Sequence, residues 1–347
     1  MAARWLGPLE LCTAVEHWPF SAPFQTAAHT LTGVDVVVVT LRKDGLAGRG
    51  EAAGVYYRND TAASMITVIE GLRSQIEAGL SRESLQTLLP PGGARNALDC
   101  AMWDLEAKAS GKFVWQLAEL KQPHPLVALV TCGADSPEQM ANCARGYIDC
   151  KALKLKLTGE PLDAARVRAV REARPDVWLS VDANQSFTPA SLEKLMPVLV
   201  DSAISLIEQP YPAERDPLLD GFHSPISLVA DESVQSASDM SRLIGRFDVV
   251  NIKLDKCGGL TEALTMARTA RDLGLDTWVG NMFGTSLAMA PGYVLGQLCK
   301  VIELDGPLFL KTDRKPSVRF AEGMVICPES LWGHPLGCAE DVVEGEW

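Results

Sequence analysis

Basic side chains are in short supply in this sequence: 32 lysines and arginines stand against 44 aspartates and glutamates, and the formal net charge is −12. Nucleic acids and anionic membranes attract proteins that carry a basic face. The charge balance therefore argues against both as partners.

Long apolar runs, a signal-peptide pattern and paired cysteines are also missing. The longest apolar stretches, such as Val34–Leu41, fall well short of the roughly 20 residues that cross a bilayer, and this one contains Asp35. The first residues, MAARWLGPLELC, lack the charged-then-apolar order of a secretory signal. Nine cysteines are scattered without a CxxC pair, which favours reduced thiols over disulfides or zinc. We expect a soluble protein of the cytoplasm.

The 347 residues, 47% of them hydrophobic, are enough for a large core, and their pattern changes along the chain. Apolar and polar residues alternate around Val34–Leu41, a turn follows at Lys43-Asp44-Gly45, and amphipathic helices are expected near Ala62–Ala78 and Arg95–Ala109. These features predict a domain of antiparallel strands and helices.

After Gln122-Pro123-His124-Pro125, eight short apolar runs recur, each followed by a helical pattern. Their spacing of roughly 25 residues is the length of a strand plus its crossover helix, which favours a closed parallel barrel. We therefore predict an α/β barrel over residues 123–306, an N-terminal α+β capping domain over 1–122, and a segment 307–347 that returns to the cap. The expected strands are Val127–Thr131, Ala152–Leu157, Trp178–Asp182, Ile204–Glu208, Ser227–Asp231, Asp248–Lys253, Thr277–Gly280 and Val301–Asp305.

Three of the predicted strands, consecutive in the chain, each end in a carboxylate: Asp182, Glu208 and Asp231. Active sites of parallel barrels lie at these carboxyl ends. Three such groups close together would repel one another, and a hard divalent cation removes that cost. An oxygen-only donor set favours Mg²⁺, with Mn²⁺ as the second choice. A single carboxylate here would more often cap the following helix, but three in successive units favour a metal.

Lysines occupy two other strand ends. Lys154 and Lys156 share one face of the second strand, and Asn251, Lys253 and Asp255 share one face of the sixth. The second and sixth strands of eight stand opposite each other. Lys156 and Lys253 could therefore act from two faces of one bound carbon, one removing a proton and the other returning it.

A cation between these lysines would favour the neutral amine, and it would hold a carboxylate whose α-carbon is the acid. Lysines near strand ends are usually solvent-exposed, and we expect that of Lys151 and Lys256. Glu303 and Asp305 share a face of the eighth strand. They could bind a substrate ammonium, or they could be an ordinary helix-start pair ahead of Gly306-Pro307.

With these residues in place, the chain resembles the enolase superfamily over essentially its whole length. It is similar to the muconate-lactonizing subgroup, and within it to dipeptide epimerases of the L-Ala-D/L-Glu epimerase type. The segments that carry the resemblance are ARNALDCAMWDL (94–105), LKLK (153–156), VDANQ (181–185), EQP (208–210), ADES (230–233) and NIKLDKCGG (251–259).

The resemblance implies a modified (β/α)7β TIM barrel and a Mg²⁺-dependent isomerase. By it, Lys156 and Lys253 are the acid/base groups of a 1,1-proton transfer through a metal-stabilised enolate. Asp182, Glu208 and Asp231 bind the metal, and Lys154 contacts the substrate carboxylate. Glu303 and Asp305 take the place of an acidic pair, usually two aspartates, that receives the ammonium of the dipeptide.

One departure affects the expected substrate. Family members that act on glutamate carry an arginine shortly after a Pro-Phe pair, whereas Pro23-Phe24 is followed here by QTAAHT. His29 is the candidate substrate contact in that loop, or a loop histidine without a ligand. Arg58, beside Tyr57 in a second cap loop, could supply the missing charge.

The substrate is accordingly expected to be L-Ala-D/L-Glu or another L-Ala-X dipeptide, with a homo-oligomer compatible with the sequence. Two other activities keep the same machinery, an N-acylamino acid racemase and a lyase similar to o-succinylbenzoate synthase. Against both, an acylated substrate has no ammonium for the eighth-strand acids. A non-catalytic binding protein on this fold should have lost a base or a metal ligand, and none is missing.

Overall fold

The computed structural model describes residues 8–25 and 30–335. The chain begins with a three-stranded antiparallel sheet in the order β1-β2-β3, formed by β1 (Glu10–Gln25), β2 (Thr30–Lys43) and β3 (Leu46–Ala52). The predicted turn joins β2 to β3. Asp44 and Gly45 both have positive φ, of 50° and 79°, as the two-residue turns that match the twist of a hairpin require.

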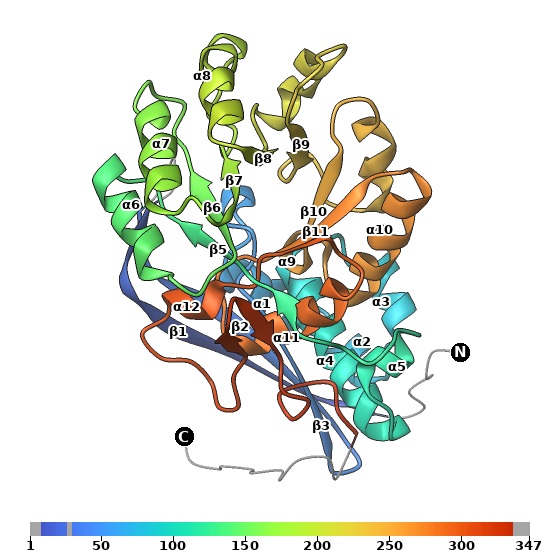
Figure 1. The fold of residues 1–347 in the computed structure, drawn as a ribbon. Helices are drawn as coiled ribbons and strands as arrows, with labels where there is room; N and C mark the ends of the chain where they lie inside the picture. Colours follow the sequence, from blue (N-terminus) through green and yellow to red (C-terminus); the bar gives the residue numbers. More distant parts are fainter. Residues whose placement is uncertain (1–7, 26–29, 336–347) are drawn as a thin grey trace.

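Helices cover one face of this sheet and complete the capping domain (Figure 1). The helix expected over 95–109 is present, but the one expected over 62–78 is divided at Leu72, whose dihedrals are not helical. The division lets the second piece meet the sheet, because the carbonyl of Glu77 accepts the backbone N–H of Leu9 at 2.8 Å. The helices are η1 (Tyr56–Arg58), α1 (Ala62–Gly71), α2 (Arg73–Glu77), α3 (Arg82–Leu88), α4 (Gly93–Ser110) and α5 (Val114–Leu117).

Helix α4 lies very close to strand β3, and two glycines make the approach feasible. A Cβ atom on Gly50 would lie 2.2 Å from the carbonyl oxygen of Ala97, and one on Gly48 would lie 2.3 Å from that of Ala101. Residues 93–107 of α4 are all buried, since the helix is covered by the sheet on one side and by barrel elements on the other.

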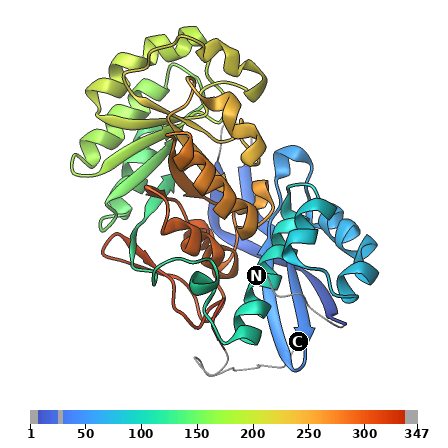
Figure 2. The same ribbon diagram turned by 90° about the vertical axis from the view of Figure 1, so that its right-hand side faces the viewer.

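The second part of the chain is the predicted parallel barrel. Its eight strands lie in the order β12-β11-β10-β9-β8-β7-β6-β5, which is the order of the sequence. Helices surround them on the outside (Figures 1 and 2). The strands are β5 (Leu129–Cys132), β6 (Ala152–Lys156), β7 (Trp178–Asp182), β8 (Ile204–Glu208), β9 (Ser227–Ala230), β10 (Val249–Lys253), β11 (Asp276–Gly280) and β12 (Val301–Ile302).

Six of the eight expected strands have different bounds, and three of these differences bear on the site. The first run splits into β4 (Leu126–Val127) and β5, and β9 stops at Ala230, so that Asp231 follows the strand. Strand β12 has only two residues, because Glu303 and Asp305 lie beyond it and accept hydrogen bonds from Thr131 of β5. These contacts, of 2.9 Å to Glu303 and 2.8 Å to Asp305, join the first and last strands of the barrel.

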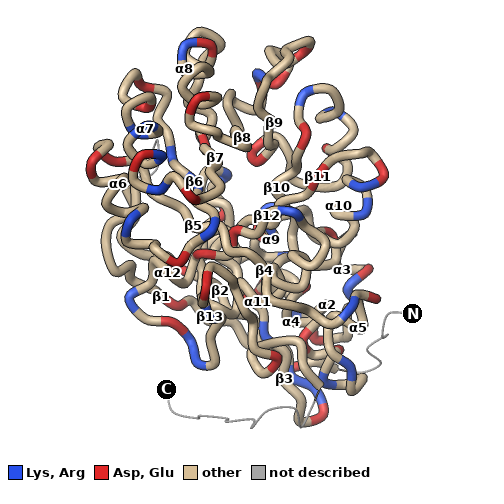
Figure 3. The backbone as a smooth tube through the Cα atoms, viewed as in Figure 1, with Lys and Arg blue, Asp and Glu red and all other residues tan. Residues whose placement is uncertain are grey.

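The connections between strands are mostly α-helices. After β8 and β9 they are 3₁₀ helices instead, and in the first of these Pro217 removes a backbone donor that an α-helix would use. Positively and negatively charged residues are interspersed along the outer helices (Figure 3). The connections are α6 (Pro137–Gly146), α7 (Asp163–Ala173), α8 (Pro189–Asp201), η2 (Ala213–Leu219), η3 (Ala237–Leu243), α9 (Leu254–Cys257), α10 (Leu260–Asp272), α11 (Ser286–Gly296) and α12 (Gly306–Phe309).

The described C-terminal residues contact both parts of the molecule. Strand β14 (Met324–Ile326) pairs with β13 (Arg319–Ala321) on one side and with β4, which precedes the first barrel strand, on the other. Trp332 donates its indole N–H to the carbonyl of Arg49 in β3 at 2.8 Å. Within the described ranges no helix has the length and apolarity needed to cross a membrane.

The close packing of α4 on β3 yields a stability prediction. Gly50→Ala should lower the free energy of unfolding by about 1–3 kcal/mol, because the added methyl overlaps the backbone of α4. Urea unfolding measures the change. Gly71→Ala is the matched control, since a Cβ there meets nothing within 4 Å. Equal stability of Gly50→Ala and the wild type would contradict the described packing.

Candidate active site

The strand register brings the predicted site residues to one level of the barrel. Lys156 of β6 lies beside Asp182 of β7, and Asp182 lies beside Glu208 of β8. Asp231 follows β9, and Lys253 ends β10 on the other side of the barrel. All five are buried, and the barrel thus gathers carboxylates and lysines that are far apart in the sequence.

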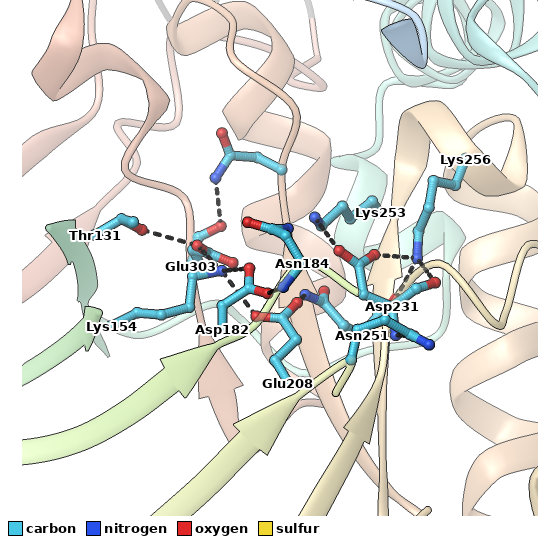
Figure 4. A network of polar contacts seen from close by, with 12 residues as sticks. Thr131, Lys154, Asp182, Asn184, Glu208, Asp231, Asn251, Lys253, Lys256 and Glu303 are labelled. Atoms are coloured by element: carbon cyan, nitrogen blue, oxygen red, sulfur yellow. Dashed lines mark hydrogen bonds and ion pairs between the residues drawn. The ribbon is translucent and has the colours of Figure 1, made fainter. Parts of the chain in front are cut away.

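Each of the three expected metal ligands is engaged by a lysine. Lys156 Nζ lies 2.5 Å from an oxygen of Asp182, and Lys253 Nζ lies 2.7 Å from one of Asp231. Lys154 Nζ lies 2.9 Å from a Glu208 oxygen. Figure 4 shows Asp182 and Glu208 near Lys154, with Asp231 between Lys253 and Lys256.

Glu303 and Asp305, which follow the last barrel strand, border the same group of ion pairs. Glu303 is ion-paired with Lys154 and accepts a hydrogen bond from the hydroxyl of Thr131, but its Oε2 is buried without a hydrogen-bond partner. Asp305 accepts the backbone N–H of Thr131 at 2.8 Å and the side-chain amide of Asn281 at 3.1 Å.

Lys256 corrects one expectation. We expected it at the surface, but it is 1% exposed and its Nζ donates to the backbone and side-chain oxygens of Asp231, both at 2.5 Å. Lys151 is exposed, as expected. Asp255 was expected on the same strand face as Lys253, but β10 ends at Lys253. The Asp255 carboxylate instead accepts the backbone N–H of Gly54 in the cap at 2.9 Å.

Two amide side chains position the carboxylates and were given no role by sequence reasoning. Asn251 donates to Glu208 at 2.6 Å. Gln209 accepts the backbone N–H groups of Asp231, at 2.9 Å, and Ser233, at 3.2 Å. Strand alternation would place Gln209 on the face opposite Glu208. Its φ of 37° shows that the strand has already turned at this residue.

The buried cluster carries more negative than positive charge. No member is more than 9% exposed, and six carboxylates oppose four ammonium groups, which leaves a formal charge of −2. The members are Asp182, Glu208, Asp231, Glu232, Glu303 and Asp305, with Lys154, Lys156, Lys253 and Lys256.

Burial and the excess of carboxylates shift the pKa values of two carboxyl groups and one lysine in the cluster. Burial, with Asp182 nearby, raises the pKa of Glu208 to about 8. Burial and the adjacent Asp231 raise the pKa of Glu232 to about 7. Burial opposes the charged form of Lys154, but Glu208 and Glu303 outweigh it and raise the pKa of this lysine. The lysines therefore do not fully compensate the buried carboxylates, and an additional cation would stabilise their ionised forms.

The donor set fits a divalent cation. The cluster's oxygens come from carboxylates and carry two uncompensated negative charges. Four buried oxygens accept no hydrogen bond, two within the cluster on Glu232 and Glu303, and two beside it on the amides of Asn184 and Asn251. Hard cations take such oxygen ligands. Among the described residues, no three carboxylate, histidine or cysteine side chains form a group that could hold a metal as they stand. The oxygens of Asp182, Glu208 and Asp231 contact lysines instead.

Above the cluster, aromatic side chains close a cavity. Tyr56 and Tyr57 come from η1 of the cap, and Phe24 from the end of β1. His29, the candidate substrate contact, lies outside the described residues. Arg58 is exposed and donates to the side chain of Gln235, so it does not line the cavity. The other lining residues above the charged groups are Met282, Phe283 and Phe309.

Comparison with known proteins identifies both the cap and the barrel as domains of one enzyme family. Residues 9–118 match the family described as "Mandelate racemase / muconate lactonizing enzyme, N-terminal domain", and residues 138–333 match "Enolase C-terminal domain-like". The chain is 39% identical over 310 residues to the L-Ala-D/L-Glu epimerase of Escherichia coli K12, covering 89% of this chain and 96% of that one.

Two further proteins extend the comparison. An N-acetyl-D-glutamate racemase of a Pseudoalteromonas species is 42% identical over 246 residues, which cover 71% of this chain and 78% of the relative. The solved structure of a dipeptide epimerase from Enterococcus faecalis, complexed with Mg and L-Leu-L-Tyr, aligns with a TM-score of 0.84 at 28% identity, over 94% of this chain and 98% of that one. The fold, the cluster at the strand ends and both family matches lead to one assignment: the chain belongs to the mandelate racemase/muconate lactonizing enzyme family of the enolase superfamily.

Proposed function

We propose that this protein is a Mg²⁺-dependent dipeptide epimerase that inverts the α-carbon of the C-terminal residue. The observation that carries the proposal is the pair Lys156 and Lys253, which end strands on opposite sides of the barrel with the acidic cluster between them. The chain's similarity to epimerases of dipeptides supports the substrate class.

In this proposal the two lysines exchange roles with the direction of the reaction. One amine, in its neutral form, takes the α-proton from one face of the carbon. The ammonium of the other lysine gives a proton to the opposite face, so the carbon regains four bonds with inverted configuration. The atoms balance because each lysine gains or loses one proton.

Three carboxylates, Asp182, Glu208 and Asp231, would hold the metal. A bound Mg²⁺ would offset their charge and stabilise the negative charge that develops on the substrate carboxylate as the α-proton leaves. Lys154, fixed by Glu208 and Glu303, would contact the same substrate carboxylate. Asn251 and Lys256 hold Glu208 and Asp231 in position.

The dipeptide ammonium would bind Glu303 and Asp305. The unpartnered Oε2 of Glu303 borders the cavity, and a buried acceptor without a donor is costly unless a ligand supplies one.

Free thiols at all eight cysteines in the described ranges support a cytoplasmic, reducing location.

Removing either lysine should separate proton exchange from epimerisation. Lys156→Ala and Lys253→Ala should each reduce epimerisation by about 10²–10⁴-fold. Each should still exchange the α-proton of one stereoisomer, and the isomer should differ between the two variants. Mass spectrometry in deuterated buffer measures both. Lys151→Ala, at an exposed lysine, is the control. Wild-type epimerisation by either variant would contradict the two-base scheme.

Metal binding can be measured without turnover. Mg²⁺ at a hundredfold its dissociation constant should raise the free energy of unfolding by about 2.7 kcal/mol. Glu208→Gln should lose most of this gain in calorimetric titration and thermal unfolding, because it removes one ligand charge while keeping the shape. Glu160→Gln, at an exposed glutamate, should keep it. Equal Mg²⁺ affinity of the two variants would remove Glu208 from the metal site.

N-acylated amino acids are the second candidate substrate, since one relative is named as an N-acetyl-D-glutamate racemase. Such substrates lack the ammonium that Glu303 and Asp305 would bind. We expect kcat/KM for L-Ala-L-Leu to exceed that for N-acetyl-L-Leu at least about tenfold, because a site built for a buried polar group rejects analogues without it. The reverse preference would favour the acylated class.

A further inference from the structure

Resting on the proposed epimerase function, we propose that Asn281 is a positioning residue for the free amino terminus of the substrate. It would act through Asp305, whose carboxylate it orients, and not by contact with the reacting carbon. Loss of Asn281 should therefore weaken binding of the substrate ammonium and leave the proton transfer in place.

Asn281 lies where the segments after two neighbouring strands meet. It directly follows β11 and borders the cavity, whereas Glu303 and Asp305 follow β12, which pairs with β11. Asn281 Nδ2 donates to the backbone carbonyl of Glu303 at 2.8 Å and to a carboxylate oxygen of Asp305 at 3.1 Å. One amide group thus holds both the backbone of the turn after β12 and the side chain at its end.

The orientation of this amide follows from its surroundings. A reversed amide would place its own oxygen against the carbonyl of Glu303 and the carboxylate of Asp305, and acceptors repel one another. The Asn281 Oδ1 atom instead faces Gly306, where a Cβ atom would lie 2.8 Å from it. The glycine at 306 therefore leaves room for the amide in the position that donates to Asp305.

Asp305 receives one of these hydrogen bonds on each carboxylate oxygen. Asn281 donates to Oδ1, and the backbone N–H of Thr131 donates to Oδ2 at 2.8 Å. An ionised carboxylate has about four acceptor positions, so both oxygens can still accept a hydrogen bond from an ammonium. A carboxylate that is fixed before the ligand arrives loses less freedom on binding.

Asn281 also favours the form of Asp305 that pairs with an ammonium. Burial and the nearby Glu303 raise the pKa of Asp305. Lys154 opposes this rise, and so do the hydrogen bonds from Asn281 and Thr131. Without the amide donor, the carboxyl group would be less firmly oriented and more readily protonated, and a protonated carboxyl group pairs poorly with a cation.

The test compares L-Ala-L-Leu with N-propionyl-L-Leu, which has the same shape and lacks only the ammonium. Initial rates of deuterium uptake at the α-carbon, measured by mass spectrometry with Mg²⁺ present, give kcat and KM for both. We expect Asn281→Leu to lower the ratio of their kcat/KM values about fivefold, because one hydrogen bond to a charged group is lost. The change should lie in a higher KM for L-Ala-L-Leu, with kcat within about twofold of the wild type.

Two further variants show whether the amide acts through Asp305. Asp305→Asn should itself lower the ratio, and in that background Asn281→Leu should have less than about a twofold further effect, because coupled residues are not additive. The control is Asn142→Leu, the same substitution at an exposed position of α6, which should leave the ratio unchanged.

The contrary outcomes are distinct. An equal loss of kcat/KM for both substrates in Asn281→Leu, or no loss for either, would overturn the assignment while the epimerase stands. An undiminished effect of Asn281→Leu in the Asp305→Asn background would mean that Asn281 acts without this carboxylate, and would also overturn it. If the wild type does not react with L-Ala-L-Leu or any other dipeptide, the proposed function fails and the inference fails with it.

Discussion

Charge compensation among ten buried side chains is the constraint on which the site depends. An isolated charge in a protein interior costs several kcal/mol, and removing one partner of a buried pair leaves the other uncompensated. The cluster meets this constraint through register. Parallel pairing sets Lys156 beside Asp182, which joins opposite charges, but it also sets Asp182 beside Glu208, which are both acidic. Lys154 of β6 compensates the second carboxylate, because its Nζ lies 2.9 Å from Glu208. The remaining excess of two negative charges favours the binding of a divalent cation at the barrel mouth.

The fold divides the work between its two parts. The barrel supplies every charged group of the cluster, at the strand ends or just beyond them. Gln209 and Lys256 both hydrogen-bond to Asp231 and fix its position. The cap supplies aromatic side chains from η1 and from the end of β1. Glu51 of β3 joins the two parts, because its carboxylate accepts the backbone N–H of Thr285, at 2.7 Å, at the start of α11. Under the proposed function, the barrel would carry out the proton transfer and the cap would border the substrate on the other side of the cavity.

Sequence reasoning recovered the parts of the molecule that depend on local pattern. The runs 178–182 and 204–208 are strands with the expected bounds, because continuous apolar stretches of that length fit a strand buried on both faces. The parallel barrel, the cap and the position of Asp182, Glu208 and Asp231 at the ends of neighbouring strands followed from spacing and strand order. The individual roles of these residues remain a proposal.

The rest depended on tertiary contacts that no local pattern reports. Lys256 was expected at the surface because lysines usually are, and its burial follows from oxygens of Asp231 brought close by the neighbouring strand. Gln209 acts where its strand has already turned, which alternation cannot anticipate. Strand β12 is short because Glu303 and Asp305 leave it to meet Thr131 on a strand far away in the sequence.

The central claim is that two different lysines handle the α-proton from opposite faces. The most direct measurement follows the first turnovers of an L-Ala-L-X dipeptide by the wild-type enzyme in deuterated buffer with Mg²⁺. The account predicts that the newly formed epimer carries solvent deuterium at the α-carbon of its C-terminal residue from the start, since the returning proton comes from a lysine that has equilibrated with solvent. An epimer that retains the original hydrogen of the substrate would mean that one group carries the proton between faces, and would contradict the account.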